Sequence, residues 1–177
     1  MLNKIITRVF LVAIVATFAG CSGYKYGSIA HPQIKSISIA PVRNDSFEPM
    51  LATYLRKALA EQFQFDNSFK VYPYSDSANP ADCIIFAKMT ESKVTSIGTD
   101  SDDDEDTYQP AKWTVSVSGE FEIIIPGEAT PVFAKRMVTA SATYQVYAGN
   151  RITKRRGLQQ ACRNLAKQIV SYTTEAW

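Results

Sequence analysis

Cys21 is the side chain whose surroundings in the sequence point most directly to a chemical reaction. Residues 1–8 carry Lys4 and Arg8 and no acid, and residues 9–19 form an uncharged, mostly apolar run. A run of about eleven residues is typical of the core of a signal peptide and is too short to cross a bilayer, which needs roughly 20 apolar residues. Cleavage after this run would place the Cys21 thiol at the start of the mature protein.

The segment Phe18-Ala19-Gly20-Cys21 resembles the bacterial lipobox, in which a bulky apolar residue and two small residues precede a cysteine. This resemblance implies a lipoprotein signal peptide over residues 1–20, diacylation of the Cys21 thiol and a lipidated tether over residues 21–33. Phe18 stands where leucine is commonest. The alternatives are an ordinary secretory signal that ends near a cysteine, and a transmembrane anchor.

Nucleophilic and metal-assisted catalysis lack their usual residues in this sequence. The single histidine, His31, precedes Pro32 in the tether, and there is no CxxC pair and no glycine-rich phosphate loop. Glu120 and Glu122 lie two residues apart on a predicted strand, where solvated acids are a simpler interpretation than a catalytic carboxylate pair. We therefore expect a protein that is not an enzyme and that uses no metal and no cofactor.

Acidic and basic residues balance in total but are unevenly distributed. Removal of residues 1–20 takes two of the 19 Lys and Arg and none of the 17 Asp and Glu, so the mature chain is formally neutral and gives no reason to expect nucleic-acid binding. Residues 100–106 hold six acids, which indicates a solvated loop. A calcium site is the alternative, although the run lacks the spacing, central glycine and closing glutamate of an EF-hand.

Bases without acids occupy residues 135–167. Four of them lie at the start of a predicted last helix, where the helix macrodipole disfavours cations: Arg151, Lys154, Arg155 and Arg156. Cations beside free backbone N–H groups are suited to an anion such as phosphate or to an acidic protein surface, and a merely solvated basic turn is the alternative. Lys135 and Arg136, on the preceding strand, are candidates for a similar binding surface.

The first half of the chain predicts a strand, a helix and two further strands. Residues 34–42 alternate, which predicts a half-buried strand with Ser36 and Ser38 on its polar side. A helix over residues 48–65 follows, with Asp45 or Ser46 as the N-cap and Glu48 completing a capping box. Its apolar stripe consists of Leu51, Leu55, Ala58, Leu59, Gln62 and Phe63. Residues 69–72 and 82–94 predict the next two strands.

The second half predicts a long hairpin and a final helix. Residues 111–126 predict a long strand, in which apolar and polar side chains alternate from Trp113 to Ile123. Residues 131–148 predict its hairpin partner, with a bulge expected at residues 135–137. A helix over residues 154–174 carries an apolar stripe of Leu158, Ala161, Cys162, Leu165, Ile169 and Val170. Two amphipathic helices and a sheet with one apolar face predict a single domain over residues 34–177, an α+β two-layer sandwich with both helices on one face of a mostly antiparallel sheet.

Cys83 and Cys162 both fall on predicted core-facing positions. A disulfide between them is compatible with an envelope location, and two separate buried thiols are the alternative.

Over nearly the whole predicted mature sequence, the chain resembles the LptE family of lipopolysaccharide-assembly lipoproteins. The pieces that carry the resemblance are CSGYKYG, KSISIAPVRNDSFEPMLATYLRKALAEQF, FKVYP and NPADCIIFAKMTES, then the long paired strands and a helix that ends near Trp177. PVRNDS and ADCIIFAKM, in that order, are the strongest of them.

This resemblance implies an outer-membrane lipoprotein on the periplasmic face, which plugs and helps to assemble the LptD β-barrel and receives or loosens lipopolysaccharide without covalent catalysis. Ser22 after the lipidated cysteine, rather than aspartate, agrees with sorting to the outer membrane. In the family, bases on one edge of the domain contact lipopolysaccharide. The matching position in VFAKRMV is Lys135, with Arg136 beside it. At the other contact loop, where family members carry an arginine, this chain has TDSDDDED.

A second resemblance gives the main alternative. IAPVRNDS, the helix after it and FKVYP are also similar to the lipoproteins that activate penicillin-binding proteins, which share a strand–helix–strand start. The alternatives are therefore an activator of peptidoglycan synthesis and a lipoprotein with a structural role in the envelope. The long hairpin and the acidic loop before it favour the LptE family.

Overall fold

Six strands and two helices make up the described part of the chain, which covers residues 34–77, 79–97, 111–146 and 153–174 of this computed structural model. In order they are β1 (Ser36–Ile39), β2 (Arg43–Asn44), α2 (Leu51–Asp66), β3 (Lys70–Tyr72), β4 (Cys83–Ile97), β5 (Ala111–Ile124), β6 (Phe133–Val146) and α3 (Thr153–Thr174). The predicted signal peptide, Cys21 and its tether, the acidic run 100–106 and Arg151 lie outside the described residues.

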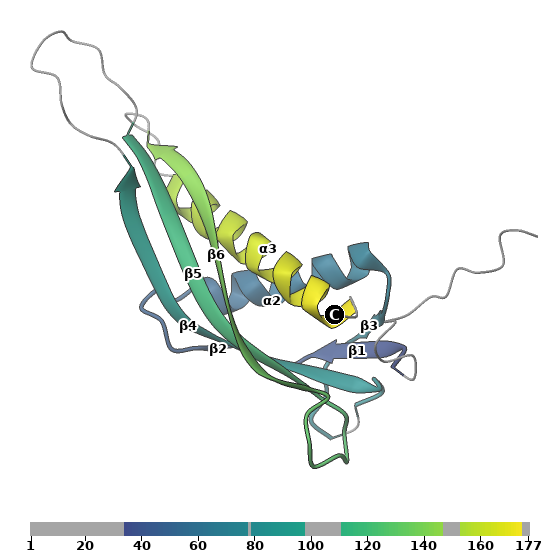
Figure 1. Ribbon diagram of the computed structural model, residues 1–177. Coiled ribbons are helices and arrows are strands. Elements are labelled where there is room, and N and C mark those ends of the chain that lie inside the picture. The colour runs from purple at the N-terminus through teal and green to yellow at the C-terminus, as the bar shows by residue number, and fades with distance from the viewer. Residues whose placement is uncertain (1–33, 78, 98–110, 147–152, 175–177) are drawn as a thin grey trace, which may run out of the picture.

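The strands form one sheet in the order β3-β1-β4-β5-β6, and β2 pairs with β4 beside this path. β1 is parallel to β3 and β4, and β2 is parallel to β4, whereas β4–β5 and β5–β6 are antiparallel. Both helices cover the same face of the sheet, with α3 running along the long strands (Figure 1). The predicted two-layer α+β sandwich is therefore confirmed, and we call the uncovered side of the sheet its outer face.

The core lies between the two helices and the inner face of the sheet. Helix α3 packs on β5, β6 and α2, and α2 also contacts the short parallel strands. The predicted stripe of α3 is fully buried, and so is that of α2 except for Gln62, which is half-buried. Each large aliphatic side chain buried in this way contributes roughly 1.5–3 kcal/mol to folding, so this face determines where the helices dock.

The outer side of β1 differs from the prediction. Ser36 and Ser38 are buried rather than solvated, because the segment before β4 folds over them. Asn79 donates to the Ser38 hydroxyl at 2.6 Å, and the Ser36 hydroxyl donates to Asp82 at 2.8 Å. The expectation of a half-buried strand was therefore wrong: β1 lies between two parallel strands and both of its faces are covered, with the hydroxyl groups hydrogen-bonded.

Asp82 fixes the start of β1 and provides a pH-dependent test of this arrangement. Its Oδ2 accepts the backbone N–H groups of Lys35 and Ser36, both at 2.9 Å, as well as the Ser36 hydroxyl. These hydrogen bonds, those from the Lys35 backbone and the Ser36 hydroxyl first, lower the pKa of the Asp82 carboxyl below its usual 3.8. These hydrogen bonds therefore stabilise the folded state fully above the unfolded-state pKa of Asp82. This stabilisation is lost as the pH falls through the lower folded-state pKa.

We expect Asp82→Ala to reduce the free energy of unfolding at pH 7 by about 1–2 kcal/mol, a range kept low because the site is open to solvent. Urea unfolding at a series of pH values measures the effect, and the difference from wild type should shrink below pH 3.8. Glu128→Ala, in the exposed turn between β5 and β6, is the matched control. A pH-independent loss in Asp82→Ala would show that the carboxylate charge is not what stabilises this corner.

Helix α2 begins later than predicted and without the expected capping box. Its first residue is Leu51, and Met50, in the N-cap position, makes no side-chain cap hydrogen bond. Asp45 instead pairs with Lys88 at 3.2 Å, and the Glu48 carboxylate pairs with Lys154 of α3. The predicted cap residues are thus engaged by distant parts of the chain. Asn67 ends the helix in the left-handed conformation, with φ 58°, as asparagine tolerates there.

The predicted bulge in the last strand is confirmed. Phe121 of β5 faces Arg136, whereas Ile123 faces Phe133, so β6 has one residue more than β5 between these pairs. A second irregularity occurs between Met89 and Glu91 of β4. Bulges increase the local twist and redirect side chains, and both flank the site described next.

Candidate functional site

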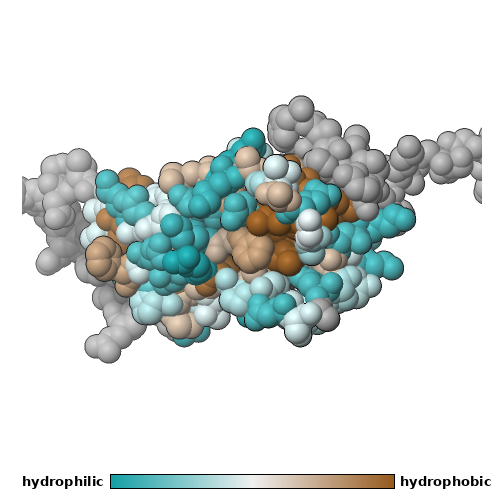
Figure 2. All heavy atoms as spheres, turned by 90° about the horizontal axis from the view of Figure 1, so that it is seen from below, coloured by the Kyte–Doolittle hydropathy of each residue, from teal (hydrophilic) through white to brown (hydrophobic). Residues whose placement is uncertain are grey.

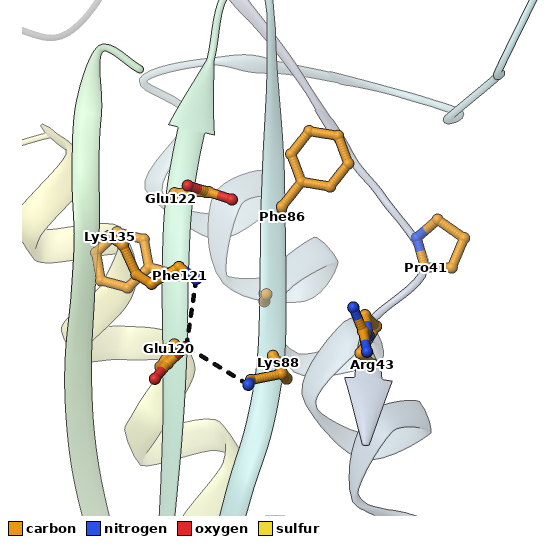
Figure 3. Close-up of a pocket in the computed structure, with 9 residues that line it drawn as sticks. Pro41, Arg43, Phe86, Lys88, Glu120, Phe121, Glu122 and Lys135 are labelled. Atoms are coloured by element: carbon orange, nitrogen blue, oxygen red, sulfur yellow. Dashed lines mark ion pairs between the residues drawn. The ribbon is translucent and has the colours of Figure 1, made fainter. Parts of the chain in front are cut away.

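A pocket of about 220 Å³ opens on the outer face of the sheet, where β2, β4, β5 and β6 come together. It is lined by Pro41, Arg43, Phe86, Ala87, Lys88, Glu120, Phe121, Glu122 and Lys135 (Figure 3). Lys88 of β4 and Glu120 and Glu122 of β5 stand at alternate positions of their strands. The intervening side chains, such as those of Ala87 and Phe121, are buried toward the helices. The same alternation that builds the core therefore collects these charges on the opposite face. We call this set the outer-face pocket.

A chain of ion pairs crosses the pocket. Glu120 Oε2 lies 3.7 Å from the Nζ atoms of both Lys88 and Lys135, and Lys88 also pairs with Asp45. Lys88 and Glu120 are directly opposite each other on β4 and β5, a position in which opposite charges stabilise a sheet. The Glu120 side chain is only 23% exposed. The prediction of two solvated acids is thus incomplete, because Glu120 is occupied by two lysines.

Arg43 and Lys135 are the cations of the pocket that remain most available to a ligand. Lys135 is 61% exposed despite its contact with Glu120. Arg43 is exposed and, among the described residues, is in no ion pair of 4.0 Å or less. Phe86, half-buried, supplies an apolar wall beside them (Figure 3). Guanidinium and ammonium groups next to an apolar surface suit a phosphate carried by a partly apolar molecule.

The surroundings of the pocket are also partly apolar. Ile84 of β4 pairs directly with Ile124 of β5 on the outer face, and both side chains are half-buried. Seen from below, the molecule shows an apolar area with hydrophilic residues along part of its border (Figure 2). Apolar area bordered by polar residues is the composition typical of binding surfaces.

The other predicted site residues lie elsewhere. Arg136 is on the inner side of β6, where its guanidinium lies 4.7 Å from the ring centroid of Tyr172 near the end of α3. Lys154, at the start of α3, pairs with Glu48, while Arg155 and Arg156 are exposed. Tyr172 follows Lys154 by 18 positions, or about 27 Å of helix axis. Lys135, which contacts Glu120, and Arg136, which contacts Tyr172, point to opposite faces of the sheet, and Arg136 lies near the end of α3 opposite to Lys154.

Arg43, Lys88 and Phe86 were not singled out from the sequence. Arg43 and Lys88 lie within PVRNDS and ADCIIFAKM, but nothing in their spacing from Lys135 reveals that they share a pocket. The parallel pairing of Arg43 with Lys88 brings the two together. A short parallel strand of two residues leaves no periodic signal, so this part of the site depends on tertiary structure.

Cys83 and Cys162 are both buried and both free in the structure. Burial raises the pKa of each thiol to about 12. At neutral pH the reactive thiolate is therefore scarcely populated. Of the two sequence-based alternatives, the structure has the pair of buried thiols.

We expect neither thiol to react with iodoacetamide in the native protein at pH 7.5, and both to react after unfolding in guanidinium without any reductant. Mass spectrometry of the alkylated peptides measures this directly. A chain that needs reductant before it can be alkylated in guanidinium contains the disulfide instead.

The described residues contain no group of three or more His, Cys, Asp or Glu side chains placed to hold a metal ion. Neither α2 nor α3 combines the length and the apolar composition of a membrane-spanning helix.

Solved structures share the architecture at low sequence identity. A hypothetical protein of Chlamydia trachomatis is 12% identical with a TM-score of 0.52, and the match covers 78% of this chain and 95% of that one. The PelC dodecamer of Paraburkholderia phytofirmans is 13% identical, also with a TM-score of 0.52, over 85% of this chain and 95% of that one. These similarities show the fold alone.

Comparison of the sequence itself is more specific. None of the curated protein sequences matches this chain significantly. Among protein families, however, residues 34–173 match LptE, described as lipopolysaccharide-assembly. That match runs from two residues before β1 almost to the end of α3 and so includes both the fold and the outer-face pocket. The chain belongs to the LptE lipopolysaccharide-assembly family.

Proposed function

We propose that this protein is a lipoprotein, anchored through Cys21 to the periplasmic face of the outer membrane, that partners an LptD-type β-barrel in the delivery of lipopolysaccharide to the outer leaflet. The family match over residues 34–173 is the observation that carries this proposal. The apolar run and the Phe18-Ala19-Gly20-Cys21 segment support the lipid anchor. The role is that of a binding and assembly partner without covalent catalysis.

Within this function, the outer-face pocket is the contact for lipopolysaccharide. Lys135 and Arg43 offer charge-assisted hydrogen bonds to phosphate, and Phe86 offers contact to an apolar part of the same ligand. The Arg136 guanidinium lies over the ring of Tyr172, so its role is to hold β6 against α3. The cations at the α3 start, Lys154, Arg155 and Arg156, do not line this pocket, and we assign them, together with Arg151, to the protein partner.

Affinity purification of the tagged chain from detergent-solubilised envelopes, after growth with a palmitate analogue, tests the proposal. We expect the chain to carry the lipid label and to bring with it about one equivalent of a large β-barrel protein. Cys21→Ala should lose the label and stay uncleaved by lipoprotein signal peptidase. Recovery of a penicillin-binding protein in place of the barrel would overturn the proposal in favour of an activator of peptidoglycan synthesis.

A further inference from the structure

Strand β6 is the last strand of the sheet and, among the described elements, has a strand neighbour on one side only. Its other edge therefore presents backbone groups that no described strand pairs. Such an edge is a template for another strand unless the sequence protects it. Two observations identify which residues of β6 direct their backbone groups outward.

The first observation is a hydrogen bond from α3 to the edge. Asn164 Nδ2 donates to the backbone carbonyl oxygen of Ser141 at 2.8 Å, so this carbonyl is directed away from β5. In an antiparallel pair the N–H and C=O of one residue point the same way, and the direction alternates along the strand. Thr139 and Thr143 therefore share the outward direction of Ser141.

The second observation agrees with this assignment. The hydroxyl groups of Ser118 and Thr139 are 2.9 Å apart, and those of Thr114 and Thr143 are 3.3 Å apart, each pair directly opposite across β5 and β6. Side chains approach most closely at pairs that exchange no backbone hydrogen bonds. The outward groups are thus the N–H of Thr139, Ser141 and Thr143 and the C=O of Thr139 and Thr143.

The sequence of β6 protects the edge at its beginning, and farther along the strand the Asn164 side chain covers the Ser141 carbonyl. Pro131, the bulge, Lys135 and Arg136 are all devices that discourage edge pairing, and all come before residue 137. Residues 137–146 contain no charge and no proline. They are instead threonine, alanine, serine, valine and other residues compatible with strand pairing.

The charge next to this edge indicates what kind of segment would pair with it. An open groove of about 470 Å³ straddles the edge, lined by Ser116, Thr139, Ala140, Ser141, Asn164, Lys167 and Gln168. Lys167 is exposed and in no ion pair among the described residues. From residue 133 to residue 174 the sequence has bases but no Asp or Glu. An acidic strand is therefore complementary to this side of the molecule.

We propose that residues 137–143 of β6 pair with an extended acidic segment of a partner protein, which adds a strand to the sheet and places a carboxylate beside Lys167. This surface goes beyond the proposed function, because it requires neither lipopolysaccharide nor the outer-face pocket. A second copy of the chain fits less well. A two-fold axis near Ser141 would bring the basic sides of two copies together.

A pair of labelled peptides tests the proposal on the full chain in detergent micelles. One is Glu-Glu-Val-Thr-Val-Thr-Val-Glu-Glu, and the other has lysine in place of every glutamate. We expect the acidic peptide to bind at least tenfold more tightly by fluorescence anisotropy. We also expect it to slow hydrogen exchange at the amides of Thr139, Ser141 and Thr143, compared with the chain without peptide.

Ser141→Pro is the decisive variant, because it removes an outward N–H that the pairing with β5 does not use. It should reduce the affinity for the acidic peptide about tenfold, whereas Ser141→Ala, which keeps the N–H, should stay within twofold of wild type. Lys167→Glu, which leaves the backbone intact, should invert the preference between the peptides even if the proline variant folds poorly. Equal binding of both peptides, unchanged amide exchange, or self-association of the wild type through this edge would overturn the proposal. None of these results would bear on co-purification of the barrel.

Discussion

Lys135→Glu is expected to weaken the capture of lipopolysaccharide by this protein roughly ten- to a hundredfold. Lys135 is the more exposed of the two lysines that contact Glu120, and its Nζ lies at the rim of the outer-face pocket. Loss of a hydrogen bond to a charged group costs about 1.5–3 kcal/mol, which corresponds to this range of affinity. The charge reversal at position 135 also places a third carboxylate beside Glu120 and Glu122, and this negative charge would repel phosphate.

The same substitution should change stability little. The pair between Lys135 and Glu120 is largely exposed on the lysine side, and exposed pairs contribute about 0–1 kcal/mol. Lys57→Glu is the matched control, because it changes the net charge equally at a site on α2 that is 74% exposed and, in the described part of the chain, forms an ion pair with Glu61 alone. Capture on immobilised lipopolysaccharide at several salt concentrations measures both variants. Equal losses in the two would mean that net charge, and not the pocket, governs binding.

Arg43→Glu is expected to behave like Lys135→Glu, because both cations face the same pocket from different strands. We therefore expect the effects of the two substitutions on lipopolysaccharide affinity to depend on one another, as is usual for groups that contact one ligand. Arg155 and Arg156 should not show this dependence, since they do not line the outer-face pocket. This pattern separates lipopolysaccharide contact from contact with the barrel.

How far the fold follows from the sequence depends on the range of the interactions that determine each element. The long strands and α3 are determined by the alternation of their own side chains, and the predicted inward residues, such as Val115, Val117 and Leu165, are buried. The bulge near Lys135 was predictable for the same reason, because it interrupts that alternation. Local periodicity is sufficient where one face of an element is covered by the core.

The errors occur where partners are distant in the chain. Ser36 and Ser38 have the spacing of a solvated strand face, and only the position of Asn79 and Asp82 reveals that they are buried and hydrogen-bonded. Asp45 and Glu48 fit a capping box, but lysines on β4 and α3 engage them instead. In both places a tertiary hydrogen bond or ion pair replaces the local one that the pattern predicts.

The candidate site likewise has a part that the sequence predicts and a part that depends on tertiary contacts. Lys135 could be selected from the sequence through the family resemblance, whereas the predicted link to Arg136 followed from proximity in the chain. Neighbouring residues of a strand point to opposite faces, and Arg136 accordingly contacts Tyr172 on the inner side. Arg43 joins Lys135 only because β2 pairs with β4, and no spacing in the sequence encodes that contact.

Gly119→Val is expected to reduce the free energy of unfolding by about 3 kcal/mol, against the usual preference of strands for valine. Gly119 lies on the inner face of β5, opposite Met89 at the second irregularity of the sheet. A Cβ atom there would be 3.0 Å from the backbone carbonyl oxygen of Lys88 and 3.5 Å from Leu165 of α3. The carbonyl belongs to the β4 backbone and cannot rotate aside, so relief requires that the strands or the helix move apart.

Ser116→Val is the control for this substitution, since it adds a branched side chain to the same strand on the outer face and should be neutral or slightly stabilising. Urea unfolding followed by circular dichroism gives both values, provided that the m-value is unchanged. Gly119→Ala should lie between wild type and Gly119→Val. Because Lys88 and Glu120 are next to this contact, folded Gly119→Val should also lose part of its lipopolysaccharide capture. If Gly119→Val is as stable as wild type, the strands or the helix can move apart at this point. The close approach of β4, β5 and α3 then does not hold the pocket in place.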